Sequence, residues 1–445
     1  MRRRISIAAM VAGLALVATA CGGGDGSDEA TAAAPEPTTE DSAAPSEAAS
    51  EPAAEPSAEG SEAPIERADA DLVIWTDDTR APILQEIGDD FGAAEGLTVA
   101  VQQLDFGAIR DNLISRGPVG EGPDIIVGAH DWLGQLVTNG AVAPLELGDA
   151  EGDFQDVAVE ALSYEGVTYG LPYAVENVAL FRNTELAPEA PADFQAMLDE
   201  GQALVDAGEA DLPLALQVGD AGDVYHFYPI QTSFGSQIFG QNDDGSYNAD
   251  DLQIDNEGGI AFAEQLAEWG QSGVLNADVT FDIAQEAFAN GRAPYAISGP
   301  WNVEPFQAGG VDFVVEEIPS AGGEPAVPFV GVQGFMVSAY AENPLVANDF
   351  VLNYLGTEDV ARELYETGQR PPAYQSVFDE VSSDPIIAGF GEYGATGQPL
   401  PNIPAMDSVW GDYGNAQRDI LLGNGEPATL VTDAAERIRA AISAR

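Results

Sequence analysis

The sequence contains no lysine, one cysteine and two histidines. Its 15 basic residues are therefore all arginines, and 75 aspartates and glutamates bring the formal net charge to −60. Such a surface repels the phosphates of nucleic acids and anionic lipids, so we expect neither nucleic acid nor an anionic substrate as a partner. A neutral ligand fits better. A general acidic bias, as a high-salt habitat favours, would explain the same composition without any ligand.

These scarcities also limit the chemistry. A single cysteine forms no internal disulfide, and the missing lysine excludes a phosphate loop of the Gly-x-x-x-x-Gly-Lys type. The two histidines, His130 and His226, form no His-Glu-x-x-His motif, and no Cys-x-x-Cys pair occurs. No Gly-x-Ser-x-Gly elbow presents a serine nucleophile. We expect no metal, no cofactor and no enzymatic activity.

The cysteine, Cys21, ends a segment typical of export. Three arginines at positions 2–4 precede a run of apolar and small residues over 5–20, and Ala18–Gly22 matches a lipobox. This pattern predicts a signal peptide over 1–20 and a diacylglycerol on the Cys21 thiol. The protein would then sit on the extracellular face of the membrane, or in a periplasm if an outer membrane is present. Ala18 replaces the usual leucine, and a plain secretory peptide is the alternative.

After Cys21 the composition changes twice. Residues 21–69 are acidic and rich in Ala, Pro, Glu and Ser, with too few large apolar residues to fold, which predicts a disordered tether. From Asp71 onward, short apolar runs alternate with segments of helical periodicity. Strands are expected near 72–75, 97–101, 123–127, 173–175, 179–181 and 293–297. Helices are expected near 82–94, 105–116, 192–207, 257–272, 344–356, 358–367 and 428–443. The alternation predicts an α/β fold with a parallel sheet, whose ligands bind beyond the carboxyl ends of the strands.

Six segments in order carry a resemblance to a known family. They are Leu72–Trp75, Gly122–Ile126 with Ala129–Asp131, Pro172–Glu176, Ser298–Trp301, Pro328–Val332, and Pro401–Pro404 followed by Trp410. The chain over about 71–445 resembles the maltose/maltodextrin-binding proteins among the family-1 extracellular solute-binding proteins. The resemblance implies a periplasmic-binding-protein-like fold, in which two α/β lobes surround a hinge and an interlobe cleft. The implied lobes are 70–177 with 334–380, and 178–333 with 381–445.

The resemblance also implies the function and the partners. A monomeric receptor would bind a neutral, maltodextrin-like oligosaccharide in the cleft and deliver it to the transmembrane subunits of an ABC permease. Binding a sugar requires aromatic rings for its apolar faces and charged or polar groups for its hydroxyls.

Eight residues match or neighbour positions that contact the sugar in the family. Trp301, Trp410 and Tyr225 would stack on the sugar, whereas Asp131, Glu176 and Asp223 would accept hydrogen bonds from its hydroxyls. Arg80 stands where the family has a lysine that reaches the ligand. Trp132 is expected to provide a ring from a shifted position. Trp75 and Trp269 are expected in the core instead.

Several positions depart from the family pattern. Gly128 replaces a family tryptophan, Trp132 an arginine, and Gly411 and Gly414 a tyrosine and an arginine. These losses leave open a receptor for trehalose, cyclodextrin, a plant oligosaccharide or an osmolyte. A glycoside hydrolase using Asp131 and Glu176 as paired carboxylates is a weaker alternative.

Overall fold

A computed structural model describes residues 66–242 and 245–444. The predicted signal peptide, Cys21 and most of the predicted tether lie outside these residues. The last tether residues, 66–69, are described and contact the folded body: Arg67 forms an ion pair with Asp124 (2.7 Å) and donates to the Gly122 carbonyl (2.8 Å). Across both described ranges, no helix combines the length and apolarity that crossing a membrane requires.

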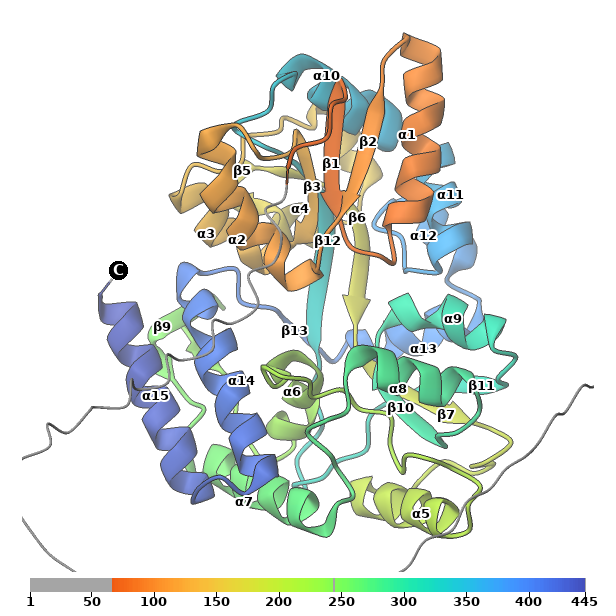
Figure 1. Cartoon of the computed structure of the whole chain (residues 1–445), viewed down its shortest axis with the longest axis vertical. Helices are drawn as coiled ribbons and strands as arrows, with labels where there is room; N and C mark the ends of the chain where they lie inside the picture. The colour runs from red at the N-terminus through yellow and green to blue at the C-terminus, as the bar shows by residue number, and fades with distance from the viewer. Residues whose placement is uncertain (1–65, 243–244, 445) are drawn as a thin grey trace, which may run out of the picture. The chain divides into compact units, whose positions relative to one another are not determined.

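The larger sheet has six strands, and β12 pairs with three of them (Figure 1). Along the sheet the order is β13-β12-β3-β1-β2, and β6 also pairs with β12. The strand bounds are β1 Leu72–Thr76, β2 Val99–Gln103, β3 Ile125–Ala129, β6 Gly170–Asn177, β12 Phe329–Val337 and β13 Gln398–Pro399.

The parallel sheet predicted from the sequence is only partly correct. β1 runs parallel to β2 and β3, as expected for strands joined by helical crossovers, and β12 runs parallel to β13. However, β12 is antiparallel to both β3 and β6. The reason is connectivity: β12 returns from the second lobe instead of following a crossover helix, so nothing fixes its direction to that of β3.

Helices and short turns cover this sheet. They are α1 Ala81–Glu95, α2 Phe106–Arg116, α3 Leu133–Thr138, α4 Asp156–Ala161, α10 Pro344–Asp349, α11 Glu358–Gly368 and α12 Gln375–Val381, with the 3-10 turns Gly117–Val119, His130–Trp132 and Gly148–Asp153 and the hairpin β4 Ser163–Tyr164 and β5 Val167–Thr168. The helix predicted at 344–356 is divided: α10 ends at Asp349, and Phe350–Leu355 form a π-helical turn.

The second lobe is built on a small antiparallel sheet with the order β10-β7-β11. Its strands are β7 Ala179–Asn183, β10 Tyr295–Ser298 and β11 Phe313–Glu316, beside a hairpin of β8 Phe239–Gln241 and β9 Tyr247–Leu252. Around them lie α5 Phe194–Asp206, α6 Val224–Thr232, α7 Glu257–Ser272, α8 Phe281–Ala289, α9 Val303–Ala308, α13 Pro385–Gly394, α14 Asp407–Leu422 and α15 Pro427–Ser443, with the 3-10 turns Pro300–Asn302 and Pro404–Met406.

The buried apolar residues form two separate hydrophobic cores. One contains Trp75 and Phe335, and the other contains Phe181 and Trp269, so the expectation that Trp75 and Trp269 are core residues is confirmed. The chain passes from one hydrophobic core to the other at three places: between Leu171 and Val178, between Phe329 and Val332, and between Ala373 and Phe390. Each lobe therefore has its own core, and β6 and β12 lead from the first toward the second (Figure 1).

Candidate functional site

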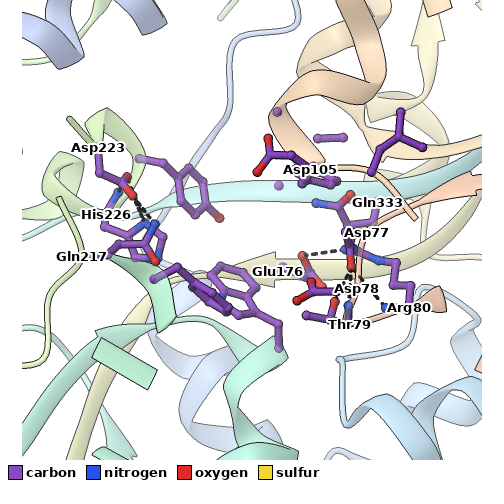
Figure 2. A pocket seen from close by; sticks show the side chains of 18 of the residues that line it. Asp77, Asp78, Thr79, Arg80, Asp105, Glu176, Gln217, Asp223, His226 and Gln333 are labelled. Atoms are coloured by element: carbon purple, nitrogen blue, oxygen red, sulfur yellow. Dashed lines mark hydrogen bonds and ion pairs between the residues drawn. The ribbon is translucent and has the colours of Figure 1, made fainter. Parts of the chain in front are cut away.

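A cavity of about 780 Å³ lies between elements of the two lobes. All eight residues predicted to bind a ligand line it: Arg80, Asp131, Trp132, Glu176, Asp223, Tyr225, Trp301 and Trp410. Figure 2 shows Asp77–Arg80 and Asp105 on one side and Gln217, Asp223 and His226 on the other. The volume of the cavity falls in the range of small-molecule binding sites. The structure thus brings together residues that are up to 330 positions apart in the sequence (Arg80 to Trp410).

A cluster of four charged side chains forms the first-lobe wall. Arg370 donates to Glu176 through Nη1 and to the Thr79 hydroxyl (2.7 Å) through Nη2, and Arg80 donates to Asp77. Nη2 of Arg80 lies 3.9 Å from Glu176. All four charged side chains are at most 7% exposed. Two acids and two arginines balance, so the cluster favours neither an anion nor a cation.

The loop after β1 holds Asp77 in this cluster. Asp77 Oδ1 accepts hydrogen bonds from the backbone N–H groups of Thr79 (2.9 Å) and Arg80 (3.1 Å), and these turn the chain into α1. Burial acts to raise the pKa of Asp77, but the positive charges of Arg80 and Arg370 outweigh it, and the pKa is lowered. Asp77 therefore stays ionised and keeps the Arg80 side chain in place.

Asp131 lies beyond the carboxyl end of β3 in a different environment. Its side chain is buried, and Oδ1 has no hydrogen-bond partner among the described residues. Burial raises its pKa from 3.8 to about 7, although Arg110 and a hydrogen bond with the Trp410 side chain act to lower it. Arg110 itself pairs with Asp407 across the two lobes (2.8 Å). Asp131 thus carries an oxygen that is available to a donor on a ligand.

Asp131→Asn is expected to raise stability at pH 8 and to have little effect near pH 4. Because the folded-state pKa of about 7 lies above 3.8, the wild type loses stability as the pH rises between these values. The loss is at most about 4 kcal/mol for a shift of about three units. Denaturant unfolding of both proteins at the two pH values measures it. An equal difference at both pH values would contradict the raised pKa.

The second-lobe wall begins at the N-terminus of α6. Asp223 caps the helix by accepting from the His226 N–H (2.9 Å), and its carboxylate also contacts the His226 ring and the Gln217 amide. The close approach of Gly414 in α14 fixes this loop, because a Cβ at Gly414 would lie 2.3 Å from the Ala221 carbonyl oxygen. The glycine at 414 therefore serves packing instead of the ligand contact that an arginine would supply.

Aromatic rings line the same cavity. Tyr225 lies 6.3 Å from Trp301 between ring centroids, and the Arg370 guanidinium lies 5.9 Å from the Trp301 ring. Trp301 and Trp410 are both half-buried, so each keeps part of its ring accessible. Burial, reinforced by the charges of Glu176, Asp131 and Asp223, raises the pKa of Tyr225, whose hydroxyl stays protonated as a donor.

Trp132 occupies the place that Gly128 leaves free. A Cβ at Gly128 would lie 2.5 Å from the Trp132 ring, which packs against Phe106 with centroids 4.7 Å apart. The missing side chain at 128 and the extra one at 132 thus compensate each other in space. Trp132 is 5% exposed and forms part of the wall beside the cavity.

The sequence alone does not point to several other residues that line the cavity: Thr79, Phe106, Arg110, Gln217, His226, Gln333 and Arg370. Gln333 lies on β12 with Oε1 buried and without a partner among the described residues. The Pro371-Pro372 pair after Arg370 marks a fixed turn, but no sequence signal predicts that the Arg370 side chain enters a cleft.

His130 does not line the cavity and instead joins the two lobes. Its Nε2 donates to the Leu400 carbonyl (2.9 Å), and its Nδ1 accepts from the Val332 N–H (3.0 Å). Burial lowers the pKa of His130 to about 4.

Comparison with known proteins identifies the class. Residues 86–389 match the family of bacterial extracellular solute-binding proteins, and the chain belongs to this family. The galactooligosaccharide-binding protein of Bacillus subtilis is 27% identical and aligns over 84% of this chain and 90% of its own. The maltooligosaccharide ABC transporter solute-binding lipoprotein of Streptococcus pneumoniae is 24% identical, over 84% and 89%. The Thermus thermophilus maltotriose-binding protein, solved with maltotriose, superposes with a TM-score of 0.77 at 28% identity, covering 83% of this chain and all of that chain. The two-lobe fold expected from the resemblance is confirmed.

Proposed function

We propose that this protein captures a neutral, maltodextrin-like oligosaccharide in the interlobe cleft and delivers it to the transmembrane subunits of an ABC importer. One observation carries the proposal: a single cleft combines accessible aromatic rings with buried polar atoms that lack partners among the described residues. The rings are Tyr225, Trp301 and Trp410, and the atoms are Arg80 Nε, Asp131 Oδ1, His226 Nε2 and Gln333 Oε1. A pyranose offers apolar faces to the rings and hydroxyls, which both donate and accept, to the polar atoms.

The charges of the wall support a neutral ligand. The Asp77–Arg80 and Glu176–Arg370 pairs already satisfy each other, so neither pair offers a counter-charge to an ionic ligand. The same pairing argues for a receptor instead of a hydrolase. Glu176 is held by Arg370 and faces Arg80, which makes its carboxylate a poor nucleophile or proton donor.

The proposal includes the organisation predicted from the sequence. The lobes comprise 70–177 with 334–380 and 178–333 with 381–445, and a monomer closes around the ligand. Cys21 anchors the chain by a lipid on the extracellular face of the membrane. The name of the S. pneumoniae relative, a lipoprotein, supports the anchor.

A second candidate ligand is a galactooligosaccharide, because the B. subtilis relative that binds one aligns over most of the chain. Melting curves with maltotriose, galactotriose, trehalose and β-cyclodextrin distinguish these sugars. Ligand at 100 times its Kd stabilises the folded state by about 2.7 kcal/mol, which raises the Tm measurably. We expect the largest shift with maltotriose. A larger shift with galactotriose would reassign the ligand, and no shift with any of the four would overturn the oligosaccharide proposal.

A further inference from the structure

Neighbouring groups occupy most of the acceptor positions of the Asp223 carboxylate. One oxygen accepts from the His226 backbone N–H and approaches the Nδ1 of the His226 ring at 2.9 Å, and the other accepts from the Gln217 amide. Its side chain is 12% exposed. A carboxylate with these three donors has little capacity left for a sugar hydroxyl, although the family resemblance assigns that role to Asp223.

The ring of His226 carries the free polar atom at this place. We assign to His226 the neutral tautomer whose Nδ1–H donates to Asp223, because a carboxylate only accepts; Nε2 then carries a lone pair and is an acceptor. Nε2 is buried and has no hydrogen-bond partner among the described residues, and the side chain is 7% exposed. A buried acceptor of this kind costs stability unless a donor reaches it.

The surrounding rings place this atom beside a stacked sugar. The His226 ring stands at 79° to both Tyr225 and Trp301, with centroids 5.5 Å and 5.8 Å away. A pyranose that stacks on an aromatic ring directs its equatorial hydroxyls outward along its rim. A ring set nearly perpendicular to both stacking surfaces therefore meets the rim of the sugar.

We propose that His226 binds a hydroxyl of the sugar through Nε2 and helps to determine specificity, and that Asp223 and Gln217 are positioning residues that orient the His226 ring. This inference rests on the proposed function, since it assigns one contact within the same cleft. It changes the role of Asp223 from a direct contact to an indirect one.

Two variants of His226 test the roles of its two ring nitrogens independently. His226→Asn keeps an amide near Nδ1 that bonds Asp223 but removes the Nε2 position, whereas His226→Gln reaches the Nε2 position and gives up Nδ1. Titration calorimetry with maltotriose is expected to show an affinity loss of about tenfold for His226→Asn and about threefold for His226→Gln. The reverse order would show that His226 only supports Asp223, and would overturn the proposal. Melting curves without ligand verify that both variants fold.

The same titration on Asp223 tests the positioning role. Asp223→Asn retains an oxygen for the His226 N–H groups and is expected to cost about threefold, whereas Asp223→Ala releases the ring and costs about tenfold. Asp223→Ala combined with His226→Asn should cost little more than either alone, because both remove one contact. Equal losses in Asp223→Asn and Asp223→Ala would assign the sugar contact to the carboxylate and contradict the proposal.

Deoxy sugars provide a readout that folding does not affect. In a series of monodeoxy maltotrioses, one compound lacks the hydroxyl that His226 binds. The wild type should bind that compound about tenfold more weakly than maltotriose, and His226→Asn should bind the two with equal affinity. A penalty that persists in His226→Asn would overturn the assignment. Wild-type protein that binds no sugar at all would overturn the proposed function and this inference with it, whereas binding that ignores His226 would overturn the inference alone.

Discussion

Arg370→Met is expected to lower the free energy of unfolding by about 3–5 kcal/mol. The variant keeps most of the side-chain volume but removes the partner of Glu176, whose side chain is 2% exposed. Arg80 lies 3.9 Å from Glu176 but is already bonded to Asp77, so it does not replace Arg370. One negative charge would then be buried without compensation. Chemical denaturation of both proteins at neutral pH measures the change.

A double variant provides the control for this prediction. Arg370→Met with Glu176→Gln removes both charges and leaves the Asp77–Arg80 pair balanced, so its stability should recover to within about 2 kcal/mol of the wild type. A single variant that costs less than about 1 kcal/mol would contradict the buried pair. So would a double variant that is no more stable than Arg370→Met.

Trp410→Ala and Trp301→Ala should each reduce the affinity for the sugar at least about tenfold, since removing an aromatic anchor typically costs about 2 kcal/mol. Both side chains pack against the second core but remain partly exposed, so the loss of stability without ligand should be smaller than for a core tryptophan. Calorimetric titration and ligand-free unfolding of the same variants separate the two effects.

Trp269 is the matched control for the two cleft tryptophans. It is 4% exposed on α7 and does not line the cavity. Trp269→Ala should cost about 3–5 kcal/mol of stability and leave the affinity of the folded protein unchanged. Normal affinity in a stable Trp410→Ala variant would remove Trp410 from the binding site. A loss of affinity in Trp269→Ala as large as that in Trp410→Ala would show that the titration reports damage to the fold.

Much of the fold was predictable because apolar periodicity is a local property. The helix expected at 257–272 coincides with α7, and the strand at 179–181 lies within β7. The direction of β12 was not predictable, because it depends on a chain that leaves the first lobe and returns. The π-helical turn at Phe350–Leu355 was likewise not predictable, because its residues have the apolar spacing of an ordinary helix.

The site likewise contains residues that the sequence indicates and residues that only the tertiary structure reveals. Tryptophans and acids within family segments could be named from the sequence, and all eight line the cleft. Arg370 and His226 could not, because an arginine before two prolines and a histidine in an apolar helix look like ordinary surface and core residues. Only the tertiary structure sets Arg370 against Glu176 and leaves His226 Nε2 without a partner among the described residues. That these residues contact the ligand, with Asp223 acting through His226, stays a prediction.

The proposed function requires that a neutral oligosaccharide binds between the lobes by stacking on Trp301 and Trp410. Calorimetric titration of the wild type and of the Trp301→Ala, Trp410→Ala double variant with maltotriose tests it most directly. We expect one binding site per chain in the wild type and an affinity at least about a hundredfold lower in the double variant, provided that the two losses add. Undiminished binding by a folded double variant, or no binding of maltotriose by the wild type, would contradict this account.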